Sequence, residues 1–364
     1  MKDKKRILFI MHTPPPVHGA AMVGKYIKDS KIVNEAFVCD YINLSIAASI
    51  NDIGKLGVKK LFRYISLLNK IRKKIKVFKP KLIYVTPNTK GGAFIKDFFI
   101  VSLIKLLCKN VIIHFHNKGV SKYQDKPLFD FLYKRFFKGL KVILLAEPLY
   151  DDIKKYVKRN DVFICPNGIP QVRKMEINKG DTDRFKILFL SNMMREKGVW
   201  TLIETCKILR EKGYDFVCDF VGKWSDVSED EFCERVNEYN LNENVKAHGG
   251  KYGDEKVEYF NNADIFVLPT YDDCFPLTLL EAFEYGLPCI ASDEGGISGI
   301  VDDGENGFVI PKKNSTVLAE KIAFLMENRN IVQKFSMNVR TKFLDKYTLQ
   351  TFEKNIVSVL SKNL

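Results

Sequence analysis

Residues 264–282 read DIFVLPTYDDCFPLTLLEA, and this stretch decides the fold. The apolar run Ile265–Leu268 predicts a buried strand, and the apolar spacing over Leu277–Tyr285 predicts a helix. Two carboxylates, Asp273 and Glu281, therefore flank the start of a helix that follows a buried strand. In an open parallel sheet, ligands bind at the carboxyl ends of strands, where helix amino termini offer free N–H groups to anions. The pattern predicts a doubly wound α/β domain that binds a phosphorylated ligand.

The sequence around these two acids resembles a known family. The stretch Pro269–Pro311, which contains Gly295-Gly296 and Asp303–Phe308, resembles the donor-site signature of retaining glycosyltransferases of family 4. Family members carry two glutamates with seven residues between them, and Asp273 stands in place of the first. Helix capping would also explain an acid pair at a helix start, but it would not explain the surrounding matches.

The resemblance implies particular roles for the acids and for the turn between them. Glu281 is expected to accept hydrogen bonds from the donor ribose, and Asp273 is expected to face the transferred sugar. Because Asp is one methylene shorter than Glu, its contact with the sugar differs from that of the family. The helix start is expected to present the backbone N–H groups of Leu277 and Thr278 to the donor diphosphate. The preceding residues Phe275 and Pro276 are expected to belong to the same donor site.

A second predicted phosphate contact lies in the loop of residues 191–198, which follows the predicted strand Phe185–Leu190. The family places an arginine and, five positions later, a lysine in this loop. Lys197 matches the lysine, whereas Asn192 replaces the arginine, so Lys197 is expected to bind the diphosphate with help from Arg195. A further stretch, from Val245 through Gly249 to Lys251, corresponds to main-chain contacts with the nucleotide base. Gly299 stands where many relatives carry a glutamate.

The first half contributes fewer candidates. His116 follows the predicted strand Val111–Phe115 and resembles the family's histidine near the transferred sugar, while His114 is expected to point to the opposite side and to be structural. Gly19 ends the first loop, where a small residue lets backbone N–H groups approach the donor diphosphate or the acceptor, although a turn would explain it equally well.

Strands and helices alternate in both halves, which argues for two parallel sheets. The turn residues Pro166–Pro170 separate the halves. The resemblance implies the GT-B fold, in which two Rossmann-like, doubly wound domains face a central cleft. We expect an acceptor-binding domain over residues 1–168, with a helix of about 348–364 packing back on it, and a nucleotide-sugar-binding domain over 169–347.

Length and composition agree with this prediction. A chain of 364 residues exceeds what one core usually serves. The longest apolar runs fall short of the roughly 20 residues that cross a bilayer, and the apolar run after the basic start is too short for a signal peptide. Eight cysteines without a Cys-x-x-Cys pair indicate neither a zinc site nor disulfides, so we expect reduced thiols, a cytoplasmic location and no bound metal.

Charge divides the chain into unlike halves. Residues 1–180 carry 36 Lys and Arg against 13 Asp and Glu, whereas residues 181–364 carry 22 against 31. Residues 55–81 hold eleven of the basic side chains, interleaved at helical spacing with Leu61, Tyr64, Ile65, Leu68 and Ile71. Such a basic amphipathic helix would suit an anionic membrane surface at the inner face of the cytoplasmic membrane, or its apolar stripe would pack on its own domain.

The function implied by the resemblance is retaining, metal-independent transfer of a sugar from a nucleotide diphosphate sugar, with no cofactor besides this donor. The acceptor would be a saccharide, lipid-linked through polyprenyl diphosphate, in capsule, O-antigen or exopolysaccharide biosynthesis. A dinucleotide-dependent oxidoreductase should carry Gly-x-Gly-x-x-Gly, which the first loop lacks. A GT-B protein that binds or glucosylates nucleic acid would explain the basic half but not the acidic one, so no nucleic-acid partner is expected. A sugar-binding homologue without activity remains open.

Overall fold

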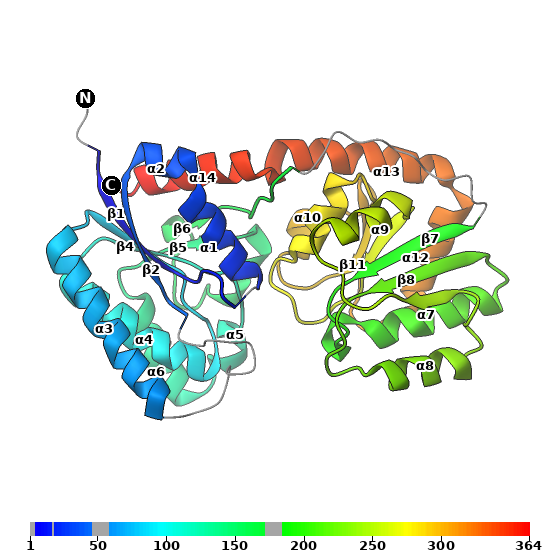
Figure 1. Cartoon of the computed structure of the whole chain (residues 1–364), viewed down its shortest axis with the longest axis horizontal. Helices are drawn as coiled ribbons and strands as arrows, with labels where there is room; N and C mark the ends of the chain where they lie inside the picture. Colours follow the sequence, from blue (N-terminus) through cyan, green and yellow to red (C-terminus); the bar gives the residue numbers. More distant parts are fainter. Residues whose placement is uncertain (1–3, 17, 46–57, 172–183) are drawn as a thin grey trace. The chain divides into compact units, whose positions relative to one another are not determined.

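The computed structural model describes residues 4–16, 18–45, 58–171 and 184–364 (Figure 1). The chain forms two compact units, of which the first comprises Met1–Gly168 together with Leu349–Leu364 and the second comprises Ile169–Thr348. Each unit is built on a six-stranded sheet whose neighbouring strands all pair in parallel. The predicted α/β class, with a parallel sheet in each half, is therefore confirmed.

The sheet of the first unit has the strand order β2-β1-β3-β4-β5-β6. Most of its strands are short apolar runs buried on both faces, as a parallel sheet between helix layers requires. The strands are β1 (Arg6–Met11), β2 (Val38–Asn43), β3 (Leu82–Val85), β4 (Val111–His114), β5 (Lys141–Leu144) and β6 (Val162–Ile164).

Helices cover both faces of this sheet. One layer contains α1 (Gly19–Asp29), α2 (Lys31–Ala36) and the carboxyl-terminal α14 (Leu349–Ser361), which contacts α2. The other layer contains α3 (Val58–Phe78), α4 (Gly91–Leu107) and α6 (Pro127–Phe137), in which α4 contacts both neighbours (Figure 1).

The sheet of the second unit has the strand order β12-β11-β10-β7-β8-β9. Its strands are β7 (Phe185–Leu190), β8 (Phe216–Val221), β9 (Val245–Ala247), β10 (Ile265–Leu268), β11 (Cys289–Ser292) and β12 (Gly307–Ile310). The helices α7 (Val199–Glu211), α8 (Glu229–Glu238) and α12 (Ser315–Glu327) lie on one face, and the other face carries α9 (Val257–Asn262), α10 (Leu277–Glu284) and α13 (Arg329–Lys342) (Figure 1).

Both sheets have a point at which the order of strands reverses, between β1 and β3 in the first unit and between β7 and β10 in the second. Ligands of doubly wound sheets bind beyond the carboxyl ends of the strands at such points. In the first unit, the His12 N–H donates to Thr86 Oγ1 across this point at 3.2 Å. In the second, the Tyr271 N–H donates to the Glu196 carbonyl at 2.9 Å. The loops that follow these strands are therefore in contact.

Among the described residues, no helix is both long and apolar enough to cross a bilayer.

Candidate functional site

The centre of the site in the second unit is an ion pair across the reversal point of its sheet. Lys197 lies at the end of the short 3-10 helix η4 (Arg195–Lys197), which follows β7, and Asp273 lies in the loop after β10. Lys197 Nζ is 2.9 Å from Asp273 Oδ2 and 3.3 Å from the carbonyl oxygen of Asp272. Their side chains are only 18% and 17% exposed. Two residues predicted separately, 76 positions apart, are thus brought together.

A glycine permits the loops that carry this pair to approach each other. Gly198 has a φ of 83°, and a Cβ there would lie 2.1 Å from the Pro269 carbonyl oxygen. Beside it, the hydroxyl of Thr270 donates to the Glu196 carbonyl at 3.1 Å. Only glycine combines the left-handed backbone with this close contact. Gly198 therefore fixes where Lys197 lies relative to Asp273.

The Gly198→Ala variant is expected to be less stable than the wild type by about 3 kcal/mol or more. Gly213→Ala is the matched control, because Gly213 has a φ of 79° at the other end of α7 with open space around its Cβ position. The control should lose only the roughly 1–2 kcal/mol cost of left-handed backbone. Urea unfolding monitored by circular dichroism measures both. Equal losses in the two variants would contradict the proposed packing role of Gly198.

The surroundings of Asp273 disfavour the charged form of its carboxyl group. Burial raises the pKa of Asp273, and the charge and hydrogen bond of Lys197 oppose that rise. The loop itself is held from the other side by the glycine pair predicted in the family signature. The Gly296 N–H donates to the Cys274 carbonyl at 2.7 Å, and a Cβ on Gly295 would lie 2.3 Å from the Asp273 carbonyl oxygen. The backbone around Asp273 is therefore fixed on both sides.

The start of α10 leaves backbone donors at the same loop. Pro276 is the residue before the helix, and no side chain of the described residues caps this end. Leu277 and Thr278 form the first turn, while Phe275 is buried and its ring lies 6.3 Å from that of Tyr347. An uncapped helix start next to a lysine is a favourable place for an anion.

Glu281 has a partner that the sequence did not predict. Both of its carboxylate oxygens lie 2.8 Å from the Nζ of Lys256, which ends the 3-10 helix η5 (Gly253–Lys256). The sequence around Lys256 contains no motif that would have singled it out. Any ligand hydroxyl that binds Glu281 must share it with this ammonium group.

The remaining predicted residues of this unit are Arg195, Asn192, Val245 and Gly249. Arg195 was expected to help Lys197 bind the diphosphate, and its guanidinium pairs with Glu231 of α8 at 2.5 Å. Asn192 is exposed at the end of β7. The Gly222 N–H donates to the Gly249 carbonyl at 2.9 Å, which holds the loop after β9. Val245 is a buried residue of β9.

In the first unit, three histidines gather near the reversal point of the sheet. His116 follows β4, His12 follows β1, and His18 precedes α1. The rings of His12 and His18 have centroids 5.8 Å apart. Both ring nitrogens of His116 are buried without a hydrogen-bond partner among the described residues. Gly19 is the first residue of α1 rather than the end of a loop.

Burial favours the neutral forms of His12 and His116. It lowers the pKa of His116 to about 3, helped by the positive charges that His12 and His18 would carry, and it lowers the pKa of His12 to about 4. A neutral imidazole with two unsatisfied nitrogens can both donate and accept a hydrogen bond. This arrangement suits a hydroxyl group better than an anion.

His114 corrects one prediction. Its ring centroid is 4.2 Å from that of His116, so the expectation that the two point to opposite sides is wrong. Residues two apart in a strand share a face, and the short loop after β4 preserves that arrangement. His114 is fully buried, and its Nδ1 is 2.7 Å from the hydroxyl of Tyr84.

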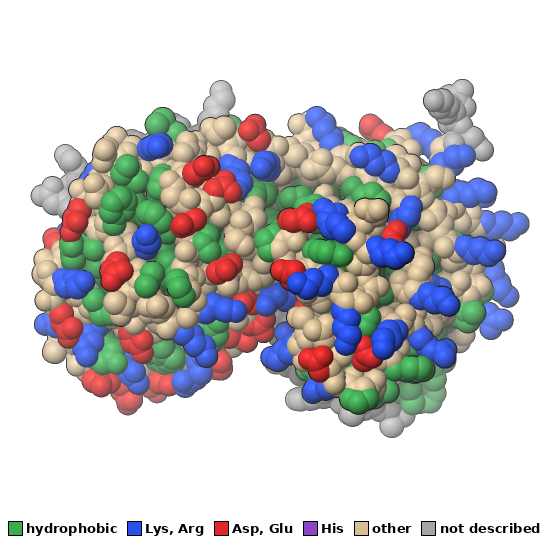
Figure 2. Space-filling model, turned by 180° about the vertical axis from the view of Figure 1, so that it is seen from behind, with side chains coloured by type: hydrophobic (Ala, Val, Ile, Leu, Met, Phe, Trp, Pro, Cys, Tyr) green, Lys and Arg blue, Asp and Glu red, His purple; other side chains and the backbone are tan. Residues whose placement is uncertain are grey.

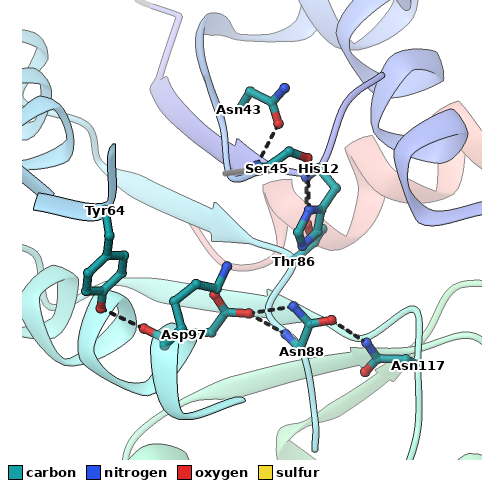
Figure 3. Close-up of polar contacts among 9 residues, drawn as sticks. His12, Asn43, Ser45, Tyr64, Thr86, Asn88, Asp97 and Asn117 are labelled. Carbon is teal, nitrogen blue, oxygen red and sulfur yellow. Dashed lines mark hydrogen bonds and ion pairs between the residues drawn. The ribbon is translucent and has the colours of Figure 1, made fainter. Parts of the chain in front are cut away.

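A chain of amides connects the loops beside these histidines (Figure 3). Asp97 of α4 accepts two hydrogen bonds of 2.8 Å from Asn88, one from the backbone N–H and one from the side chain. Asn88 Oδ1 in turn accepts from Asn117 Nδ2 at 2.9 Å, and Asn117 Oδ1 accepts from the Thr89 N–H at 3.0 Å. These bonds fix the loops after β3 and β4 relative to each other. No pattern in the sequence predicts these bonds.

The stability of the His116→Gln variant is expected to depend less on pH than the stability of the wild type. The folded-state pKa of about 3 lies below the ordinary value of 6.5, so only the unfolded chain binds this proton at intermediate pH. The stability that the protein has with neutral His116 is therefore complete above pH 6.5, and it is lost as the pH falls from 6.5 towards 3. Unfolding free energies between pH 7 and 5 should slope less steeply in the variant, by up to about 1.4 kcal/mol per pH unit. Identical slopes would contradict a neutral buried His116.

The chain is similar to known glycosyltransferases. Residues 171–342 match the family described as Glycosyl transferases group 1. The chain is 25% identical over 233 residues to the capsular polysaccharide biosynthesis glycosyltransferase CapM of Staphylococcus aureus, covering 60% of each chain. It is 22% identical over 268 residues to the amylovoran biosynthesis glycosyltransferase AmsK of Erwinia amylovora, covering 71% of this chain and 65% of that one. The alignments thus span about 60–65% of the length of these relatives.

Solved structures match nearly the whole chain. A glycosyltransferase from Rickettsia africae has a TM-score of 0.73 at 16% identity, covering 99% of both chains. Anabaena HepE, solved in complex with UDP, has a TM-score of 0.75 at 15% identity, covering 98% of this chain and 100% of that one. At this identity the likeness concerns the fold, and it confirms the GT-B fold class.

Proposed function

We propose that the chain transfers a sugar from a nucleotide diphosphate sugar to a saccharide acceptor, because residues 171–342 match the family described as Glycosyl transferases group 1 and the chain has the GT-B fold. The observation that carries this proposal is the Lys197–Asp273 pair at the reversal point of the second sheet, beside the uncapped start of α10. The names of CapM and AmsK support a place in cell-surface polysaccharide biosynthesis.

The donor diphosphate binds at the start of α10. The backbone N–H groups of Leu277 and Thr278 and the Nζ of Lys197 supply positive charge there, and the helix dipole adds to it. To reach the diphosphate, Lys197 exchanges part of its contact with Asp273 for a contact with phosphate. The likeness to HepE, which was solved with UDP, supports a nucleoside diphosphate as the ligand of this unit.

The two carboxylates take the remaining parts of the donor. Glu281 lies one helical turn into α10 and accepts hydrogen bonds from the ribose hydroxyls, with Lys256 holding its other side. Asp273 faces the transferred sugar. The glycine contacts around it matter here, because a displaced carboxylate loses most of its effect on a reacting group.

Catalysis would rest mainly on stabilising the departing diphosphate. Lys197 and the amides of α10 are fixed before the reaction, so they stabilise the charge that develops on the leaving group without reorganising. Retention of configuration follows from the family resemblance. The acceptor oxygen attacks from the face that the diphosphate leaves, and the departing phosphate oxygen takes the acceptor proton. These residues supply the required positive charge without a metal ion and without a cofactor.

The acceptor binds at the carboxyl edge of the first sheet. His12 and His116 offer neutral nitrogens to sugar hydroxyl groups, and Asn88 and Asn117 add amide groups beside them. A saccharide linked to polyprenyl diphosphate is the proposed acceptor, because the basic first half favours an anionic carrier at the cytoplasmic face of a membrane.

Release of nucleoside diphosphate from a panel of nucleotide sugars, with a polyprenyl-linked saccharide as acceptor, tests the proposed reaction. We expect turnover with one donor, and an unchanged rate after EDTA treatment. NMR of the product should show the anomeric configuration of the donor. Loss of turnover with EDTA that returns on adding Mg²⁺ would contradict metal independence, and an inverted product would contradict retention.

A further inference from the structure

Three helices on one face of the first unit begin at the same edge of its sheet. Each of α3, α4 and α6 returns antiparallel to the preceding strand, so all three start at the carboxyl edge, where the proposed acceptor site lies. The starts of α3 and α4 are in contact, since the hydroxyl of Tyr64 donates to the Lys96 carbonyl at 2.9 Å. Figure 3 shows this contact leading through Asp97 to Asn88 and Asn117.

Within their first nine residues, these helices expose large apolar side chains. We call these six residues the apolar rim, and each is between 46% and 69% exposed: Leu61, Phe62, Ile65, Phe99, Leu128 and Phe131. Further along α3, Leu67, Ile71 and Ile75 are buried. The apolar stripe of α3 therefore has two parts, one that packs on its own domain and one that reaches solvent. Exposed side chains of this kind, gathered on neighbouring helices, mark an interaction surface.

The same helices are strongly basic. They carry twelve Lys and Arg residues but only two acids, Asp97 and Asp130. Asp97 is buried, with one oxygen 2.7 Å from Lys96 Nζ, and Asp130 pairs with Lys134 at 2.6 Å and with Lys155 at 3.1 Å. In Figure 2, Lys and Arg cover much of this unit, and apolar side chains gather beside them at its lower edge. The surface around the apolar rim is therefore positive.

We propose that the apolar rim enters the boundary between headgroups and acyl chains of an anionic bilayer, with the surrounding Lys and Arg side chains binding lipid phosphates. Apolar side chains inside a basic surface are what an interfacial membrane site combines. The insertion would bring the carboxyl edge of the first sheet to the membrane surface. This inference rests on the proposed function in one respect: the membrane contact would bring the protein to a lipid-linked acceptor.

Sedimentation with vesicles tests the site. The wild type should bind vesicles of phosphatidylcholine and phosphatidylglycerol, and bind much more weakly to phosphatidylcholine alone. The rim variant Phe62→Ser/Leu128→Ser should bind the anionic vesicles about tenfold or more weakly. The matched control is Val77→Ser/Leu106→Ser, because these residues are 72% and 85% exposed at the opposite ends of α3 and α4. The control should bind like the wild type.

Three results would overturn the proposal: no binding of the wild type to anionic vesicles, equal binding to both kinds of vesicle, or equal loss in the rim and control variants. A dimer in solution that the rim variant loses, without an effect on vesicles, would assign the surface to a second copy of this chain instead. Nucleotide binding separates this test from that of the proposed function. The rim variant should still bind nucleotide, whereas Lys197→Ala should lose nucleotide binding and still bind vesicles.

Discussion

Replacing Lys197 with alanine is expected to weaken the binding of nucleoside diphosphate by roughly 30- to 700-fold. A lysine that forms a charge-assisted hydrogen bond with phosphate in a largely buried site contributes about 2–4 kcal/mol. Its Nζ is 2.9 Å from Asp273 and only 18% of the side chain is exposed, so water replaces it poorly. Isothermal titration calorimetry with wild type and variant measures the effect.

Two controls separate binding from stability in this experiment. Lys197→Ala also leaves Asp273 without its partner, so the variant should unfold at a lower temperature. The double variant Lys197→Ala/Asp273→Asn should recover stability but not nucleotide affinity. Lys207→Ala removes an exposed lysine of α7 and should behave like the wild type. Recovery of affinity in the double variant would show that Lys197 acts only through Asp273.

Replacing Glu281 with alanine is expected to weaken nucleoside diphosphate binding by roughly 10- to 100-fold, while leaving the affinity for inorganic diphosphate nearly unchanged. The carboxylate is assigned to the ribose, and two charge-assisted hydrogen bonds account for a loss of about 1.4–2.8 kcal/mol. Lys197→Ala should weaken both ligands, so the pair of variants distinguishes the two subsites. Calorimetry with each ligand measures the difference.

Lys256 gives the matching control for Glu281. It holds both oxygens of Glu281 at 2.8 Å, and the ribose must compete with it. Lys256→Ala should therefore bind nucleoside diphosphate at least as tightly as the wild type. An equal loss for both ligands in Glu281→Ala would contradict the ribose assignment and indicate a displaced α10.

Much of the fold could be predicted because its central strands are unbroken apolar runs. Leu82–Val85, Phe185–Leu190 and Phe216–Val221 lie where the sequence places them. Four strands were not predicted. Only one residue of β2 is buried, and β6 has three residues. The sequence CIAS of β11 contains Ala, whose β-propensity is low, and GFVI of β12 is only four residues long and begins with Gly.

The site could be predicted only where a local pattern marks it. Lys197, Asp273 and Glu281 stand at fixed distances from strands and helix starts, which the family signature records. Lys256 ends the short 3-10 helix η5, where no such pattern marks it, and only the fold brings it to Glu281. The chain from Asp97 through Asn88 to Asn117 joins two loops 29 residues apart. Contacts of this kind depend on strand order, which a single sequence does not state.

A thermal-shift panel with the wild-type protein tests the central claim, which is that the second unit binds a nucleoside diphosphate. The panel contains the common nucleoside diphosphates, the corresponding nucleotide diphosphate sugars, NAD and duplex DNA. We predict that one nucleoside diphosphate and its sugar raise the melting temperature, and that NAD does not. A rise with NAD alone, or a response to DNA alone that disappears with salt, would contradict the account and favour an oxidoreductase or a nucleic-acid-binding protein.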